Sequence, residues 1–479
     1  LLHRCRLGGI LADDMGLGKT LQTLALIAHA RRQADGTEPP FLVVAPTSVV
    51  PVWAQEAGMQ TPDLDVRVVR ESTKKRGTSF AEVAAGADVI VVSYAILRLD
   101  EDEIAGLEWA GLVLDEAQFV KNASSQVHQA AKAVRAPFRL ALTGTPLENS
   151  LRDVWSLLAI TAPGLFPSPH RFEEEYVRPI EGGENPGRMQ RLQRRIRPFM
   201  MRRTKDLVAA DLPEKQEQVI TVELSAAHRK LYDRILQKER KKILGFIESD
   251  YDRQRFIVFR SLTLLRMLAL DPRIVDAEHA EVPSSKLTAL LDHLDEVIAE
   301  GHRSIVFSQF TSFLDHVAEE LDRRGVPSVM LDGSTRNRAE VVESFRAGAA
   351  PVFLISLKAG GFGLTLTEAD YVFLMDPWWN PAAENQAIDR AHRIGQTKHV
   401  IVYRYVTEGT IEEKVLGLQR KKAELFDSLM SEGDEARSGP ASGSGASGPA
   451  ALLGGPSGGD GQAFSREITA DDIRDLFDG

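Results

Sequence analysis

GGILADDMGLGKT, which spans Gly8 to Thr20, is the stretch of sequence that decides the fold. An apolar triplet follows its glycines, and Leu21, Leu24 and Ile27 come after it at helical spacing. A short strand, a glycine-rich loop and a helix are therefore predicted in that order, which is the setting of a phosphate-binding loop. The residues expected to hold a nucleoside triphosphate are Gly16, Leu17, Gly18, Lys19 and Thr20.

Each residue type in this loop has a chemical reason to be part of a phosphate-binding site. Gly16 and Gly18 allow backbone N–H groups to surround phosphate oxygens. Lys19 can reach the outer phosphates, and the Thr20 hydroxyl can bind Mg²⁺. Asp13 stands where the strict pattern G-x-x-x-x-G-K-T has its first glycine, so the match is partial. We expect ATP and Mg²⁺ as ligands; a glycine-rich helix start that binds nothing is the alternative for this stretch alone.

Composition limits the class of protein. The chain has 479 residues, too many for one core, and a single cysteine, Cys5, which excludes an internal disulfide. No apolar run reaches the roughly 20 residues that span a bilayer, so we expect a cytoplasmic protein without a membrane segment. The net charge of −10 repels a polyanion, and any contact with nucleic acid must be local. Residues 188–205 carry eight Arg or Lys and no acid; a nucleic-acid surface and a solvated helix face both fit them.

Short apolar runs alternate with helical stretches in two parts of the chain, which predicts an α/β fold with parallel sheets. The first domain is predicted at 1–160, with strands at 41–45, 88–93, 111–114 and 139–142. A mostly helical insert follows at 161–283, with helices expected at 225–247 and 253–270. The second α/β domain spans 284–430, with strands at 304–307, 328–331, 352–355, 371–375 and 400–405. A flexible Gly/Ser/Pro linker at 431–462 and a short C-terminal helix at 463–479 complete the predicted domains.

Two carboxylates follow the predicted strand at 111–114. Asp115 and Glu116 come at its carboxyl end, where ligands sit in parallel α/β sheets. Asp115 suits Mg²⁺ binding together with Thr20, and Glu116 suits activation of the attacking water. A solvated acidic turn is the alternative, but the phosphate loop in the same domain favours the catalytic interpretation.

Motifs in both domains resemble those of the Snf2-type ATPases, which are related to superfamily 2 helicases, including the bacterial HepA/RapA-like DNA translocases. The resemblance covers nearly everything from residue 8 to about 430. In the first domain it is carried by the phosphate loop, VVAPTSVVPVWAQE at 43–56, VVSYAIL at 91–97, LDEAQFVKN (the DEAQ box) at 114–122 and ALTGTPLENSLRDVWSL at 141–157. In the second it is carried by SIVFSQFTSFLD at 304–315, LDGST at 331–335 and the block 356–397, which contains DPWWNPAAENQAIDRAHRIGQT.

The resemblance implies two RecA-like lobes with ATP hydrolysed where they meet. Gln386, Arg390 and Arg393 are expected on one face of a helix because they are spaced four and three residues apart. A planar, permanently charged guanidinium suits the charge that develops on a transferred phosphoryl group. Catalysis would then require the lobes to close. A surface salt-bridge face is the alternative for these arginines.

The resemblance also implies contacts to the phosphates of duplex DNA by small hydroxyl residues and glycines at strand ends. The expected DNA-contacting residues are Pro46, Thr47, Ser48, Thr143, Gly144, Thr145, Ser308, Gln309, Gly333, Ser334, Lys358 and Gly363. Ordinary turn chemistry is the alternative for each residue taken alone. Trp378 and Trp379 are expected to pack in the protein instead of stacking on bases.

Two departures from the family pattern stand out. Phe362 and Thr365 replace the Thr and Asn common in bacterial members. Seven residues precede the phosphate loop, where the family has an adenine-reading segment with a glutamine, so an N-terminal truncation is expected.

The function predicted from the resemblance is that of an ATP-dependent double-stranded DNA translocase, a monomeric, nucleoid-associated ATP hydrolase that remodels protein–DNA complexes without separating the strands. Two alternatives stay open: a translocase that recycles RNA polymerase, and a nucleotide-gated binding module with little turnover.

Overall fold

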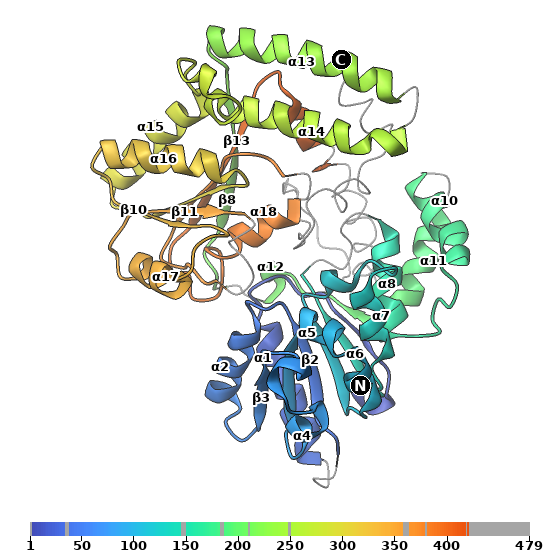
Figure 1. Cartoon of the computed structure of the whole chain (residues 1–479). Coiled ribbons are helices and arrows are strands. Elements are labelled where there is room, and N and C mark those ends of the chain that lie inside the picture. Colours follow the sequence, from blue (N-terminus) through green and yellow to red (C-terminus); the bar gives the residue numbers. More distant parts are fainter. Residues whose placement is uncertain are drawn as a thin grey trace, which may run out of the picture. The chain divides into compact units, whose positions relative to one another are not determined.

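The computed structural model describes residues 2–33, 38–144, 150–182, 186–208, 211–247, 251–357, 364–378, 381–417 and 419–420. These residues form two compact units that divide between 210 and 211. Each unit is built on one sheet in which all neighbouring strands run parallel. The predicted α/β class with two parallel sheets is confirmed (Figure 1).

The first sheet has seven strands in the order β3-β4-β2-β5-β6-β1-β7. Its strands are β1 (Gly9–Leu11), β2 (Phe41–Ala45), β3 (Val66–Val69), β4 (Val89–Ser93), β5 (Gly111–Asp115), β6 (Arg139–Leu142) and β7 (Met200–Met201). Every residue of β2, β4 and β5 is buried, as expected for central strands covered on both faces. The carboxyl ends of β1 and β5 therefore open at one edge of the sheet.

Helices cover both faces of this sheet, with α1 and α2 on one side of β2 and α5 and α6 on the other (Figure 1). Right-handed crossovers between parallel strands place them in this way. The helices are α1 (Lys19–Gln33), α2 (Val50–Gln60), α3 (Thr73–Arg76), α4 (Phe80–Ala84), α5 (Tyr94–Leu99), α6 (Glu101–Gly106), α7 (Gln126–Ala133), α8 (Leu151–Thr161), α9 (Pro169–Phe172), α10 (Arg178–Glu181), α11 (Pro186–Ile196) and α12 (Lys205–Val208). A π-helical turn, Glu173–Val177, joins α9 to α10, and 3-10 turns lie at His3–Cys5, Ala117–Val120 and Arg197–Phe199.

The second sheet has six strands in the order β10-β11-β9-β12-β13-β8. Its strands are β8 (Lys215–Val222), β9 (Ser304–Ser308), β10 (Ser328–Leu331), β11 (Val352–Ser356), β12 (Tyr371–Leu374) and β13 (Val400–Thr407). Its helices are α13 (Ala226–Ile247), α14 (Tyr251–Leu270), α15 (Ser285–Ala299), α16 (Thr311–Arg323), α17 (Arg338–Arg346) and α18 (Pro381–Ile388). Two 3-10 turns, Pro272–Ile274 and Ala277–His279, lie between α14 and α15.

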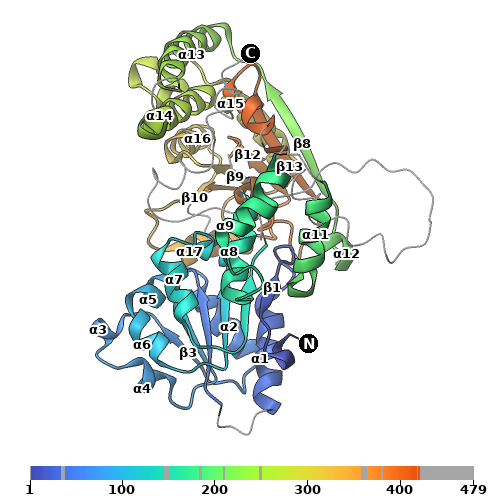
Figure 2. The ribbon, with the colours of Figure 1, turned by 90° about the vertical axis from the view of Figure 1, so that its right-hand side faces the viewer.

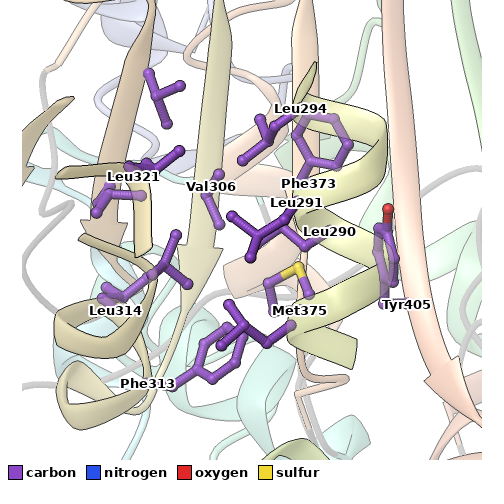
Figure 3. Packing of buried hydrophobic residues seen from close by; sticks show 14 of the residues in the cluster. Leu290, Leu291, Leu294, Val306, Phe313, Leu314, Leu321, Phe373, Met375 and Tyr405 are labelled. Atoms are coloured by element: carbon purple, nitrogen blue, oxygen red, sulfur yellow. The ribbon is translucent and has the colours of Figure 1, made fainter. Parts of the chain in front are cut away.

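Successive residues of the central strands point to opposite faces of the second sheet and pack in two separate cores. Val306 and Phe373 pack with leucines of α15 and α16 on one face of the sheet (Figure 3). Ile305, Phe307 and Val372 point to the other face and pack there against residues of α17 and α18. Alternation with period two in strands buried on both faces explains why these segments read as continuous apolar runs.

The long helices α13 and α14 lie side by side in both views and share their own apolar core (Figure 2). Tyr232 of α13 and Leu262 and Leu265 of α14 are buried there, together with Ile411 and Val415. This confirms the two long helices predicted in the segment 161–283. The boundaries of that segment as a domain stay a prediction.

The same segment also supplies strands that the sequence did not predict. β7 pairs with β1 at the edge of the first sheet, and β8 pairs with β13 along its whole length at the edge of the second. β3 was missed as well. The predicted linker and C-terminal helix lie outside the described residues.

Candidate active site

The phosphate loop leads from β1 directly into α1, as predicted. Gly16 and Gly18 have φ angles of 86° and 71°, in the left-handed region where a side chain is strained. The half-buried Lys19 begins α1, and its Nζ donates to the main-chain oxygens of Asp13 at 2.7 Å and Asp14 at 3.3 Å. The loop thus presents a lysine, a helix start and Thr20 at one sheet edge.

Asp115 is the last residue of β5 and is 6% exposed. Trp53 Nε1 donates to its Oδ2 at 2.8 Å, and the Tyr94 hydroxyl donates to its main-chain oxygen at 2.7 Å. Trp53 thus fixes the Asp115 carboxylate, and Tyr94 fixes the backbone that carries it. Trp53 lies in the segment VVAPTSVVPVWAQE at 43–56, and its local sequence does not indicate that it contacts Asp115.

Glu116 adopts a left-handed backbone conformation, with φ of 49°. For a residue with a side chain this conformation costs about 1–2 kcal/mol. Gln118 Nε2 donates to the Glu116 carboxylate at 2.9 Å, and the Thr143 hydroxyl donates to Gln118 Oε1 at 3.3 Å. Thr143, which directly follows β6, therefore orients Glu116 through Gln118. The sequence did not reveal this role for Gln118 or Thr143.

Burial and charge act in opposite directions in this site. Burial lowers the pKa of the Lys19 ammonium, and the carboxylates of Glu116 and Asp115 raise it in part. Burial raises the pKa of Asp115, against the Trp53 hydrogen bond and the Lys19 charge, which lower it. Perturbation of both groups in opposite senses is typical of a functional site.

The residues present fit ATP and Mg²⁺. Mg²⁺ in nucleotide sites takes one or two carboxylates together with substrate phosphates and water, which Asp115 and the Thr20 hydroxyl suit. In the described part of the chain no group of three or more His, Cys, Asp or Glu side chains could hold a metal without such a substrate.

In the second unit, the backbone at the two predicted arginines is not the helix that was expected. α18 ends at Ile388, so Gln386 lies on it while Arg390 and Arg393 follow in turns, and the predicted shared helix face is wrong. The Arg390 carbonyl accepts the Leu366 N–H at 2.9 Å, which draws the chain away from a helical path. Arg390 is 6% exposed, and Arg393 is half-buried with its Nη1 donating to the Thr365 hydroxyl at 3.0 Å.

The predicted DNA-contacting residues fall into three groups. Thr47, Ser48, Gly333 and Ser334 are exposed, Gly144 and Gln309 are half-buried, and Pro46 is buried. Thr143 and Ser308 are fully buried, and Ser308 donates to Asp376 at 2.6 Å, so the structure places their hydroxyls inside the protein and not at its surface. Thr145, Lys358 and Gly363 lie outside the described residues, as do Trp379 and Phe362.

Trp378 is 5% exposed, and its backbone N–H donates to Glu384 Oε1 at 2.6 Å, which confirms that it packs inside the protein. In the basic segment, Arg191, Arg194 and Arg197 are exposed on α11 and the turn after it. The Arg203 side chain instead pairs with Asp13 of the phosphate loop, and the Lys205 backbone N–H donates to Asp14 Oδ2. The basic segment is thus divided between a surface and the nucleotide site.

The fold and the site define a phosphate-loop protein of two parallel α/β units. The chain belongs to the SNF2-related family: the SNF2-related domain matches residues 1–273, and the helicase conserved C-terminal domain matches residues 285–395. It is 36% identical over 439 residues to YwqA of Bacillus subtilis (strain 168), covering 90% of this chain and 47% of that one. It is 32% identical over 440 residues to the ISWI chromatin-remodeling complex ATPase ISW1 of Saccharomyces cerevisiae, covering 88% and 39%.

Among solved structures, the chain is similar to the SWI2/SNF2 ATPase core of Sulfolobus solfataricus in complex with dsDNA, with 30% identity, a TM-score of 0.44 and 90% of each chain covered. The chain spans less than half the length of the curated relatives it matches. No helix in the described ranges is long and apolar enough to cross a membrane.

Proposed function

We propose that this chain is the motor part of an ATP-dependent double-stranded DNA translocase that couples ATP hydrolysis to the remodelling of protein–DNA complexes without full strand separation. The observation that carries the proposal is the meeting of Lys19, Asp115 and Glu116 at one sheet edge. Lys19 and Thr20 would hold the outer phosphates and Mg²⁺, and Glu116 would take the proton of the attacking water.

The relatives support an ATP-consuming activity. One is the chromatin-remodeling ATPase ISW1, and another, from Mycoplasma pneumoniae, carries the name of an ATP-dependent helicase. The proposed role of Arg390 and Arg393 is to stabilise the charge that develops on the transferred phosphoryl group. Exposed hydroxyl residues such as Thr47 and Ser334 are the proposed phosphate contacts on DNA.

The test is phosphate release by the purified chain with and without duplex DNA, alongside direct titration of a fluorescent ATP analogue. We expect DNA to raise turnover and Lys19→Ala to abolish it. Lys132→Ala, which removes an exposed lysine of α7, is the control and keeps wild-type turnover. Nucleotide binding with no turnover on any DNA would replace the translocase with a nucleotide-gated binding module.

A further inference from the structure

Asp13, the residue that departs from the strict phosphate-loop pattern, has a dedicated partner 190 residues away. Its side chain is 0% exposed. Arg203 Nε donates to the two carboxylate oxygens at 3.2 and 3.1 Å, and its Nη2 donates to Oδ2 at 2.5 Å. The Arg203 backbone N–H adds a further bond to Oδ1 at 3.0 Å. This is a forked, charge-assisted contact of the kind that only arginine makes.

The backbone on each side of Arg203 is also attached to the loop. The Ala12 N–H donates to the Met201 oxygen at 2.7 Å, and the Asp14 N–H donates to the Arg203 oxygen at 2.9 Å. The Lys205 N–H donates to Asp14 Oδ2 at 3.1 Å. Residues 201–205 therefore run beside residues 12–14 and are joined to them by hydrogen bonds.

The same loop residues hold the nucleotide-binding lysine. Lys19 Nζ donates to the main-chain oxygens of Asp13 and Asp14, the two residues that segment 201–205 fixes. Gln22 of α1 joins the network, because its Nε2 donates to Asp13 and its Oε1 accepts from Arg203 Nη2. The position of the Lys19 ammonium thus depends on the Arg203–Asp13 contact through one intervening residue.

Upstream, this segment continues directly into the exposed basic surface. Arg191 and Arg194 lie on α11, Arg197 follows it, and all three are exposed. No acidic residue lies between 188 and 205. From Arg197 the chain passes through β7 to Arg203 in six residues, and β7 is paired with β1. A polyanion on α11 would therefore act on the same short segment that holds the loop.

We infer that Arg203 is a positioning residue for the phosphate loop, and that through it the basic surface of α11 and the following turn controls nucleotide affinity when a polyanion such as duplex DNA binds there. The inference rests on the proposed function, because it assumes that the loop binds ATP. Two ligands that share one element change each other's affinity by the same factor. Duplex DNA tightens ATP binding in this scheme, and ATP tightens DNA binding equally.

The test measures binding of a fluorescent ATP analogue to the purified chain, with and without duplex DNA, in wild type, Arg203→Lys and Arg203→Ala. We expect Arg203→Ala to weaken nucleotide binding about 10-fold and to abolish the change in nucleotide affinity that duplex DNA causes. Both values for Arg203→Lys should lie between those of Arg203→Ala and the wild type. The lysine variant keeps the charge and loses the fork, so it separates positioning from simple charge compensation.

Arg31→Ala is the matched control. Arg31 lies at the other end of α1, and its Nε contacts Asp88 Oδ1 at 2.6 Å with both side chains largely buried. This variant also breaks an arginine–aspartate pair of the first unit, so its thermal unfolding shows the cost of a merely structural pair. We expect its nucleotide affinity and its response to DNA to match the wild type.

Three results decide between the ideas. Equal nucleotide affinity and equal DNA response in wild type and Arg203→Lys would overturn the inference. So would equal losses in Arg31→Ala and Arg203→Ala, because that outcome marks a general stability effect. Absence of nucleotide binding by the folded wild type would instead overturn the proposed function.

Discussion

Each unit of this protein has a lysine surrounded by acceptors, and the two lysines differ in what is left for a ligand. In the second unit, Lys286 is 0% exposed, and its Nζ donates to the Met375 oxygen at 2.6 Å, the Tyr405 oxygen at 3.0 Å and Glu412 Oε2 at 2.6 Å. Those three bonds use all the protons of the ammonium. In the first unit, Lys19 has two partners among the described residues, both main-chain oxygens.

Burial lowers the pKa of both lysines, and neighbouring carboxylates oppose that shift in both. A lowered lysine pKa alone therefore does not distinguish a binding site from a structural charge. The distinction lies in hydrogen-bond saturation and exposure. Lys286 has no proton left to donate, whereas the half-buried Lys19 makes two hydrogen bonds within the described part of the chain. The two lysines therefore differ in how many of their protons the described residues accept, and not in the direction of their pKa shifts.

The largest effect is expected at Glu116, the residue of the first unit that we propose activates the attacking water. Glu116→Gln should lower turnover by about 10²–10⁴-fold, because an amide cannot accept the proton of the attacking water. Nucleotide affinity should stay near that of the wild type, as measured by titration beside phosphate release. Glu108→Gln, an exposed change in the same unit, is the control. Full turnover in Glu116→Gln would remove this residue from catalysis and break the comparison.

In the second unit, the expected effect is on stability. Lys286→Met leaves Glu412 buried without its counter-ion, which should cost about 3–5 kcal/mol of unfolding free energy. The double variant Lys286→Met/Glu412→Leu should lose less, because it removes the orphaned charge as well. Urea unfolding followed by hydrogen exchange in peptides of the second sheet measures both. A double variant less stable than the single one would show that the unpaired charge of Glu412 is not the source of the loss.

The Trp53→Phe variant tests the ionisation of Asp115 through the pH dependence of turnover. The Trp53 hydrogen bond lowers the pKa of Asp115, so its loss should raise that pKa further above the usual range and move the acidic limb of the turnover profile to higher pH. Trp109→Phe is the matched control, since Trp109 Nε1 donates to the Ile104 oxygen at 2.9 Å and has no titratable partner there. Both variants should lose about 1–3 kcal/mol of stability. An unchanged acidic limb in Trp53→Phe alone would show that Asp115 ionisation does not limit turnover.

The smallest effect is expected for an exposed pair. Arg323 and Glu320 lie three residues apart on α16 at 2.5 Å, with the arginine side chain 63% exposed. Arg323→Ala should change the unfolding free energy by less than about 1 kcal/mol, because water and salt screen such pairs. If Arg323→Ala lost as much unfolding free energy as Lys286→Met in the same urea experiment, burial would not explain the difference in stability between the exposed and the buried pair.

Several elements were predictable because local sequence alone specifies them. The runs at 41–45, 139–142 and 328–331 form strands with those bounds, because each is a short run made mostly of apolar or β-branched residues. Of the three, the strand at 41–45 is buried at every position. The phosphate loop was predictable because its glycines must adopt conformations that other residues resist. In both the strands and the phosphate loop, the residues that specify the backbone conformation lie within a few positions of one another in the sequence.

Other features depended on partners distant in the chain. β8 has mostly exposed residues and therefore no continuous apolar run, and its partner β13 comes about 180 residues later. The helical spacing of Arg390 and Arg393 was misleading, because a tertiary bond from Leu366 takes up the Arg390 carbonyl beyond the end of α18. The partner of Asp13 was equally hidden, 190 residues away.

The sequence by itself determined the family, the central strands of both sheets and the phosphate loop, since each rests on local pattern. Which charges are satisfied depends on the tertiary structure. Among the described residues it places three acceptors around Lys286 and two around Lys19, and it sets Arg203 against Asp13. The physical reason is that saturation of a hydrogen-bonding group depends on the geometry of residues brought together from distant parts of the chain.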